Sequence, residues 1–338
     1  MTVGDGGAGP SGSRPAARAG AVHGPNYAAP LVRTSSHAIR TVAWGAVVAG
    51  VAAPVVRRRA RLPKPVVTVA TVAAPAALCV LMPRSKSRDI GTVVLQMWAY
   101  LAHYEMPNDD PAALEARVLV DYPVRIDRIL GLGELPGARL QRRLGRPGRL
   151  RAPEQVLVWA HWVWFLVPHG TVLYVFLRRR DRFETTALMT YAVFDLGLIG
   201  YWAVPTAPPW YAARKGRAPE LRRLMVEHGE AFWKARWGPL YGFLGGNPLA
   251  AMPSLHFATS VMAAHLLSDV GRVEGAIGWA YASTLGFALV YLGEHYVVDL
   301  LAGLALAEGV RRHGHRAAPV LQAVGRTLQR LEAAAARA

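Results

Sequence analysis

The sequence is poor in cysteine and in charged side chains. Cys79 is the only cysteine among 338 residues, which excludes a disulfide within the chain and argues against a thiolate metal cluster. Charged residues make up 18% of the chain, compared with about 25% in a typical soluble domain. Hydrophobic residues make up 52% and gather in runs close to the length of a membrane span. These features favour a polytopic membrane protein.

Negatively charged residues are also scarce. The chain has 22 Asp and Glu against 39 Lys and Arg, a net charge of +17. A basic chain can bind nucleic acid or anionic lipid. Because this one is rich in apolar runs, we expect the membrane to be the partner and expect no binding of nucleic acid.

The first half of the chain divides by composition. Residues 1–36 are rich in Gly, Ala, Pro, Ser and Arg without an apolar period, which predicts a disordered tail. They lack the pattern of a signal peptide. Residues 37–104 hold apolar runs that predict a membrane hairpin and then a short span or interfacial helix. Residues 105–154 mix arginine with apolar residues, which predicts an amphipathic segment on the membrane surface.

The second half shows a stronger pattern. Residues 155–311 contain five apolar runs, at about 155–177, 185–204, 253–268, 274–292 and 296–310. Short polar connections make neighbouring helices antiparallel, so the ends near 204, 253, 292 and 296 should emerge on one face. The sequence therefore predicts that Pro205–Trp210 and two polar motifs meet there. Residues 312–338 are predicted to form a basic surface tail or helix.

One polar motif joins His295 and Asp299. Residues four apart share a face of a helix, so the carboxylate can accept a hydrogen bond from one imidazole nitrogen. This would fix the tautomer and leave the other nitrogen as a nucleophile. A polar cap at the membrane interface and a metal site are the alternatives, since His and Asp are both ligands. No further ligands are evident nearby in the sequence.

The other motif is Pro253-Ser254-Leu255-His256. Proline is favoured at the first helical position, and the free N–H groups of a first turn attract anions. Ser254 would add a donor, and His256 would protonate a leaving group. Asn247 lies in the preceding loop as a further substrate-binding candidate. The alternative is a plain helix start with an isolated histidine.

Phosphate also needs cations, which arginine supplies with two parallel hydrogen bonds. Seven basic residues lie between 205 and 252: Arg214, Lys215, Arg217, Arg222, Arg223, Lys234 and Arg236. Arg214 and Lys215 are closest to the Pro205–Trp210 motif and are the expected substrate-binding pair. Asp195 lies inside an apolar run, where a structural and a catalytic role stay open. His161 is expected to make helix contacts.

These motifs resemble the type 2 phosphatidic acid phosphatase superfamily. Its second motif, P-S-x-H, is matched by Pro253, Ser254 and His256, and its third ends in H-x-x-x-D, matched by His295 and Asp299. The resemblance covers about 155–311.

The resemblance is incomplete at two places. The family's first motif, K-x-x-x-x-x-x-R-P, is not found, and Ala288 and Leu289 stand where Ser-Arg usually begins the third motif. Other cations must then clamp the phosphate. The version in this chain is similar to the inositolphosphotransferase branch, which contains inositol phosphorylceramide synthase.

The resemblance implies an all-α polytopic membrane protein. Its six-helix phosphatase-type core would carry an extra N-terminal membrane helix or hairpin. His295 would attack phosphorus and form a phosphohistidine, Asp299 would orient it, and His256 would protonate the departing oxygen. No metal or other cofactor is implied.

The implied activity is that of a lipid phosphotransferase or a lipid phosphate phosphatase. The substrate would be a phospholipid or a polyprenyl or sphingolipid phosphate. The acceptor would be water or an alcohol such as inositol. The active site would lie on the extracytoplasmic face of what is expected to be a bacterial cell membrane. A non-catalytic membrane protein, or a transporter that uses intramembrane histidines, is the alternative.

Overall fold

The computed structural model describes residues 28–146, 151–244 and 246–337, and this part of the chain is helical. It contains no sheet, only an isolated bridge between Leu119 and Thr206. The prediction of an all-α fold is confirmed for these residues. Most of the predicted disordered tail, residues 1–27, lies outside the described residues. The rest of it is helical, because the first helix already begins at Ala28.

Sixteen α-helices and four short 3-10 helices make up the described chain. The α-helices are Ala28–Ala60 (α1), Lys64–Leu81 (α2), Lys86–Glu105 (α3), Pro111–Arg117 (α4), Asp121–Leu130 (α5), Pro136–Leu144 (α6), Ala152–Trp162 (α7), Leu166–Arg178 (α8), Phe183–Ala203 (α9), Pro209–Arg214 (α10), Leu224–Trp233 (α11), Trp237–Leu244 (α12), Leu255–Ser268 (α13), Arg272–Tyr291 (α14), Val297–His313 (α15) and Ala318–Ala335 (α16). The 3-10 helices are Met106–Asp109, Arg180–Arg182, Lys234–Arg236 and Gly314–Ala317.

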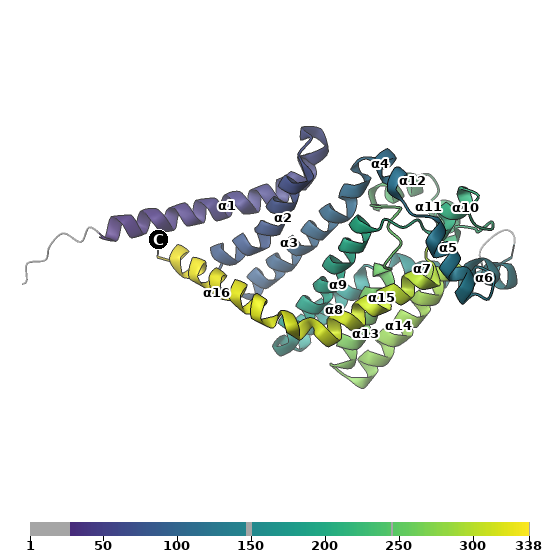
Figure 1. The fold of residues 1–338 in the computed structure, drawn as a ribbon. Coiled ribbons are helices and arrows are strands. Elements are labelled where there is room, and N and C mark those ends of the chain that lie inside the picture. Colours follow the sequence, from purple (N-terminus) through teal and green to yellow (C-terminus); the bar gives the residue numbers. More distant parts are fainter. Residues whose placement is uncertain (1–27, 147–150, 245, 338) are drawn as a thin grey trace, which may run out of the picture.

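The long helices form a bundle with the short ones gathered at one end (Figure 1). Helices α8, α9, α13, α14 and α15 pack together, and α3 joins this group against α9. The α1–α2 hairpin lies beside α3, and α16 runs back across it at the opposite end from the short helices. The long helices thus bring the N-termini of α13 and α15 to the end that the short helices cover.

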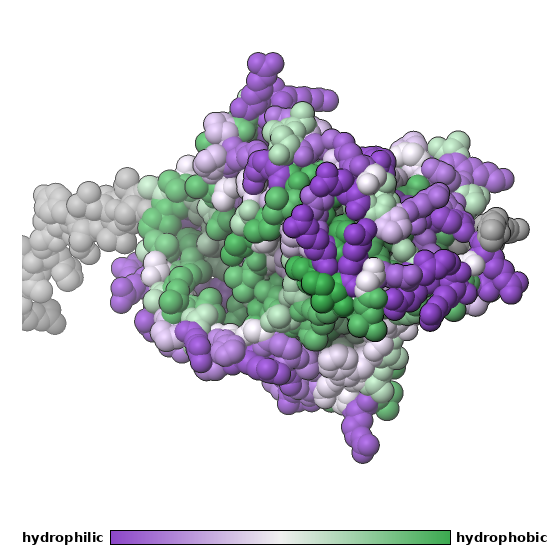
Figure 2. Space-filling view, turned by 45° about the vertical axis from the view of Figure 1, so that its right-hand side comes forward, coloured by the Kyte–Doolittle hydropathy of each residue, from purple (hydrophilic) through white to green (hydrophobic). Residues whose placement is uncertain are grey.

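Three described helices are long and apolar enough to cross a membrane. They are α2, α14 and the Ser36–Ala60 part of α1. The pair α7 and α8 would add a fourth if this bent pair is one span. Hydrophobic residues cover a hollowed middle part of the face in Figure 2, and hydrophilic residues gather at its edges. The protein is therefore an integral membrane protein, whereas the six-helix core stays a prediction.

Two predicted segments are broken in the structure. The run at 155–177 becomes α7 and α8, which meet at 59°. Pro168 explains the break, because it has no N–H for the carbonyl of Trp164 and its ring crowds that carbonyl. The amphipathic segment 105–154 contains α4, α5 and α6, and a turn in which Leu132 and Gly133 have positive φ separates α5 from α6. Residues 147–150 of that prediction lie outside the described residues.

Two glycines allow the Pro253–Leu255 segment to lie deep between helices. A Cβ on Gly197 of α9 would stand 2.3 Å from Leu255, and one on Gly303 of α15 would stand 2.6 Å from the Ser254 carbonyl oxygen. Small residues let helices approach closely in membranes. The start of α13 is thereby packed directly against the start of α15.

Arg57 ties the α1–α2 hairpin to the end of α3. Its side chain is 7% exposed, and its guanidinium binds Glu105 at 2.9 Å and Asp109 at 3.0 Å. We expect Arg57→Ala to lower the free energy of unfolding by about 2 kcal/mol, because both acids lose a charged partner. Thermal unfolding of the purified protein in detergent measures this change. The control is Arg58→Ala, whose 60% exposed side chain also reaches Asp109; equal shifts for both variants would contradict the prediction.

Candidate active site

The HxxxD motif is ordered around the N-terminus of α15. Asp299 Oδ2 accepts hydrogen bonds from His295 Nδ1, at 3.1 Å, and from the Tyr296 amide, at 2.9 Å. The prediction that the two residues share a helical face is wrong, because His295 precedes α15. The spacing works because Asp299, in the first turn of α15, reaches back to the residues before that turn. Both side chains are buried.

The two histidines of the sequence motifs are in contact. His295 Nε2 lies 3.2 Å from His256 Nδ1. Because Asp299 accepts the Nδ1 proton of His295, the Nε2 atom carries a lone pair and accepts a hydrogen bond from His256. The proton of His256 then lies on Nδ1, beside the prospective nucleophile. The arrangement combines a nucleophile, its orienting carboxylate and a proton donor.

A cavity of about 130 Å³ opens beside these groups. Both histidines line it, together with His161, Trp210, Arg223, Asn247 and Glu294. His161 comes from α7 and Trp210 from α10, Arg223 precedes α11, Asn247 and His256 lie before and at the start of α13, and Glu294 and His295 follow α14. Tertiary packing therefore joins five separate parts of the chain at one cavity.

Arg223 is the cation that the structure places in this cavity. Its guanidinium binds Glu294 through two hydrogen bonds, of 2.9 and 3.0 Å, and lies 4.1 Å from the ring of Trp210. Burial opposes its charge, but Glu294 more than offsets burial, so the pKa of Arg223 is raised above its ordinary value. A permanent positive charge is thus held beside His295.

Two nitrogen atoms of the cavity wall have no partner within the described residues. They are Asn247 Nδ2 and His161 Nδ1, both buried. His161 also stacks on His256, with ring centroids 5.0 Å apart. A buried polar group without a hydrogen bond costs about 1–3 kcal/mol. Such groups on a cavity wall are suited to binding oxygen atoms of a ligand.

Comparison with known proteins finds a family that part of the chain matches. Residues 151–310, here called the PAP2 segment, match the family model described as PAP2 superfamily. This segment, just under half of the chain, is therefore similar to that superfamily. His161, Arg223, His256, His295 and Asp299 all lie inside the PAP2 segment.

Three curated relatives indicate the branch of the superfamily. The chain is 32% identical over 155 residues to a phosphoinositol dihydroceramide synthase of Bacteroides thetaiotaomicron, which is 43% of this chain and 50% of the relative. It is 30% identical over 119 residues to the inositol phosphorylceramide synthase catalytic subunit aur1 of Schizosaccharomyces pombe, or 33% of this chain and 28% of the relative. It is 31% identical over 120 residues to an inositol phosphorylceramide synthase of Candida albicans, which is 33% of this chain and 25% of the relative.

The predicted resemblance to the inositol phosphorylceramide synthase branch is confirmed by these matches. The chain spans half the length of the first relative and less of the other two. No solved structure gives a significant match.

The structure places three predicted substrate-binding residues outside the cavity of the PAP2 segment. Arg214 packs over the rings of Trp210 and Tyr211, and Lys215 pairs with Glu115 at 3.4 Å. Ser254 is fully buried as the N-cap of α13, where its hydroxyl accepts the Phe257 amide. Of the predicted set, Asn247 alone lines the cavity.

The prediction that Pro253 stands at the first position of a helix is also wrong. Helix α13 begins at Leu255, so Pro253 stands before the N-cap instead of at the first helical position. The Ser254 amide donates to the Asp299 carbonyl at 3.0 Å. Ser254 therefore joins α13 to α15, and its side chain is fully buried outside the cavity.

Arg223 was one of seven candidate cations in the sequence and was passed over for residues nearer to Pro205–Trp210. Distance along the chain misled here, because α10 turns Arg214 and Lys215 away from the cavity. The one available signal was Glu294, an acid directly before His295, which requires a basic partner when buried.

Other ionisable groups lie apart from the cavity. Asp195 accepts a hydrogen bond from Gln96 at 2.7 Å between α9 and α3. Among the described residues, no group of three or more His, Cys, Asp and Glu side chains is placed to hold a metal ion. At the opposite end of the bundle, Arg182 and Arg311 both contact Asp269.

Proposed function

We propose that this protein is an integral membrane phosphotransferase that forms a phosphohistidine at His295. The observation that carries the proposal is the chain of contacts from Asp299 through His295 to His256, at the wall of a cavity that also holds Arg223. This arrangement supplies a nucleophile, a proton donor and a cation for phosphate. The match of residues 151–310 to the PAP2 superfamily supports it.

In the first step, His295 Nε2 attacks phosphorus as the bond from phosphorus to the leaving oxygen breaks. His256 enters this step in its imidazolium form, the leaving oxygen takes one of its two ring protons and departs as an alcohol, and His256 is left as a neutral imidazole. Asp299 stabilises the positive charge that develops on the imidazole of His295. Arg223 and the Asn247 amide bind the non-bridging oxygens of the phosphoryl group.

In the second step, His256 accepts the proton of an incoming hydroxyl. The oxygen of that hydroxyl attacks phosphorus, and the bond between phosphorus and Nε2 breaks. The enzyme returns to its starting protonation state. With water as the acceptor, the same step would be hydrolysis, so the choice of acceptor separates a transferase from a phosphatase.

The substrates are proposed from the names of the relatives, which are inositol phosphorylceramide synthases and a phosphoinositol dihydroceramide synthase. We propose a phospholipid with an inositol phosphate headgroup as donor and a ceramide-type lipid hydroxyl as acceptor. The first leaving group would then be diacylglycerol.

We also propose that the cavity faces the extracytoplasmic side of a bacterial cell membrane. The α8–α9 connection with Arg178–Arg182 and the last turn of α15 with Arg311 lie at the other end of the bundle, as the positive-inside rule favours. The basic residues at the cavity end would contact anionic headgroups. A transporter would need polar groups through the depth of the bundle, whereas the proposed catalytic groups gather at one end.

The test is product analysis with the full chain in lipid nanodiscs. Phosphatidylinositol with labelled inositol is supplied with or without dihydroceramide, in EDTA, and His295→Ala gives the background. A labelled ceramide product supports transfer, and labelled inositol phosphate without acceptor indicates hydrolysis. If the protein is folded and neither product exceeds the background, the proposal is overturned.

A further inference from the structure

A segment before the PAP2 segment makes hydrogen bonds to several of the segments that form the candidate site. We call residues 118–144 the brace; they include α5, α6 and the strand-like residues before α5. The PAP2 match begins only at residue 151. The brace packs over the ends of α14 and α15, at the end of the bundle with the cavity (Figure 1).

The start of the brace holds the Pro205–Trp210 motif. The Leu119 amide donates to the Pro205 carbonyl at 2.8 Å, and the Ala207 amide donates to the Leu119 carbonyl at 3.0 Å. The Tyr122 hydroxyl lies 2.6 Å from Thr206 Oγ1 and donates to Met252 Sδ at 3.2 Å. The brace thus connects the Pro205–Trp210 segment with the residue before Pro253.

The middle of the brace caps the helix that carries Asp299. Asp127 accepts the Val297 amide on Oδ2 and the Val298 amide on Oδ1, both at 2.9 Å. The Asp127 side chain is 1% exposed. Burial raises its pKa to about 6, against the two amides, which lower it, so the carboxylate is mostly ionised at neutral pH. Asp127 therefore fixes the turn between His295 and Asp299.

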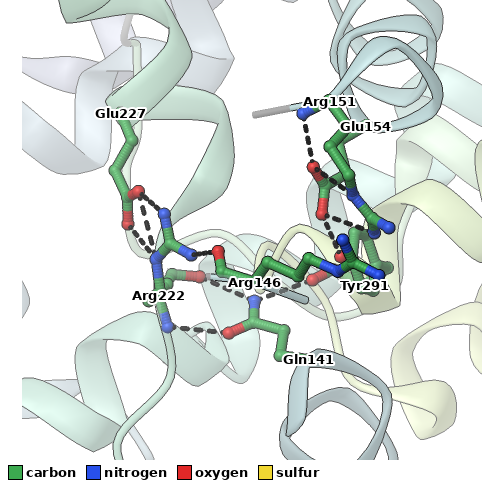
Figure 3. A network of polar contacts seen from close by, with 7 residues as sticks. All are labelled: Gln141, Arg146, Arg151, Glu154, Arg222, Glu227 and Tyr291. Atoms are coloured by element: carbon green, nitrogen blue, oxygen red, sulfur yellow. Dashed lines mark hydrogen bonds and ion pairs between the residues drawn. The ribbon is translucent and has the colours of Figure 1, made fainter. Parts of the chain in front are cut away.

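The end of the brace holds the backbone before Arg223. Gln141 Oε1 accepts the Arg222 amide at 2.9 Å, and Gln141 Nε2 donates to the carbonyls of Arg222, at 2.8 Å, and Tyr291, at 2.7 Å (Figure 3). Tyr291 is in turn bound to Glu154 of α7. Because Glu294 follows Tyr291 closely, Gln141 links the backbones that carry both partners of the Arg223–Glu294 ion pair.

We propose that the brace aligns the site, with Asp127 and Gln141 as positioning residues. Asp127 sets the orientation of His295 and Asp299, and Gln141 sets the position of Arg223. This inference rests on the proposed function. A displacement of about 1 Å in reacting groups can cost about 100-fold in rate. The residues that do the chemistry would then depend on a segment that the family match does not include.

The two residues predict different kinetic effects. We expect Asp127→Asn to lower kcat about 10- to 100-fold with little change in KM, because the amide can replace only one of the two acceptors and the nucleophile is displaced. We expect Gln141→Leu to raise KM about 10-fold with a smaller effect on kcat, because Arg223 binds the substrate phosphate less well. The matched controls are Asp121→Asn, which removes an exposed carboxylate of α5 paired with Arg217, and Gln322→Leu on the exposed surface of α16.

The assay uses the full chain in nanodiscs with phosphatidylinositol and dihydroceramide. We would also measure hydrogen exchange at residues 295–299 and the affinity for orthovanadate, a phosphate analogue. Faster exchange in Asp127→Asn, with its kcat loss and a melting temperature near that of Asp121→Asn, supports the proposal. If Asp127→Asn does not fold, Asp127→Ser, which keeps one acceptor oxygen, replaces it.

The measurements distinguish a failure of the brace proposal from a failure of the proposed function. If wild type has no turnover, the proposed function fails, and exchange and orthovanadate affinity decide the brace alone. If both positioning variants have the kcat and KM of the wild type, the proposal that the brace aligns the site is overturned. If wild type is inactive, wild-type exchange and orthovanadate affinity in both variants would overturn it.

Discussion

Replacing His295 with alanine is expected to abolish phosphoryl transfer, with a loss in kcat of about 10,000-fold or more. The variant keeps the cavity, Arg223 and His256 but has no atom that can bond to phosphorus. Wild type incubated with a ³²P-labelled lipid substrate and quenched in base should carry label on the protein, since phosphohistidine is stable in base and labile in acid. His295→Ala should carry none.

His256→Ala separates the role of proton donor from the role of nucleophile. It removes the proton donor but leaves the nucleophile, so we expect a kcat loss of about 100- to 10,000-fold, with His295 still in place to accept label. His315→Ala, in the 3-10 helix beside α16, is the control for loss of a histidine elsewhere. Label of equal amount on His295→Ala and on wild type would show that another residue is the nucleophile.

Replacing Arg223 with alanine is expected to lower kcat/KM about 100- to 1,000-fold, the usual effect of removing one donor to a developing negative charge. The loss should be larger than for an exposed cation, because Arg223 lies in a cavity and its removal also leaves Glu294 buried without its partner. Steady-state kinetics with phosphatidylinositol as donor measure it.

The matched comparison is with the two cations that sequence distance favoured. Arg214→Ala and Lys215→Ala should change kcat/KM less than threefold, because neither side chain lines the cavity. Arg223→Lys should recover little, since an ammonium cannot reproduce two parallel hydrogen bonds. A larger loss in Arg214→Ala or Lys215→Ala than in Arg223→Ala would restore the original assignment of the phosphate-binding cations.

The sequence located most of the helices and the three residues of the proposed chemistry. This was possible because the relevant patterns are local. A membrane span needs a continuous apolar run, and His295 and Asp299 are close enough along the chain to contact each other in almost any helical arrangement. His256 was found through its motif, and the antiparallel packing imposed by short connections brought it to the same end.

The sequence was less reliable where a local pattern permits several outcomes. It predicted an active Ser254 hydroxyl, but the N-terminus of α13 uses that hydroxyl as its cap. It also predicted that His161 would serve only helix packing, yet the bend between α7 and α8 leaves His161 against His256 at the cavity wall.

By itself, therefore, the sequence determined the membrane-embedded helical fold and predicted His256, His295 and Asp299 as one set, which the structure brings into contact. The tertiary structure alone decided that Arg223 is the cation of the cavity and that Asp127 and Gln141 hold the site from outside the PAP2 segment. The reason is physical. Asp127 lies 170 residues from Val297 along the chain, and a contact over that separation depends on how the helices pack, which no short pattern of residues records.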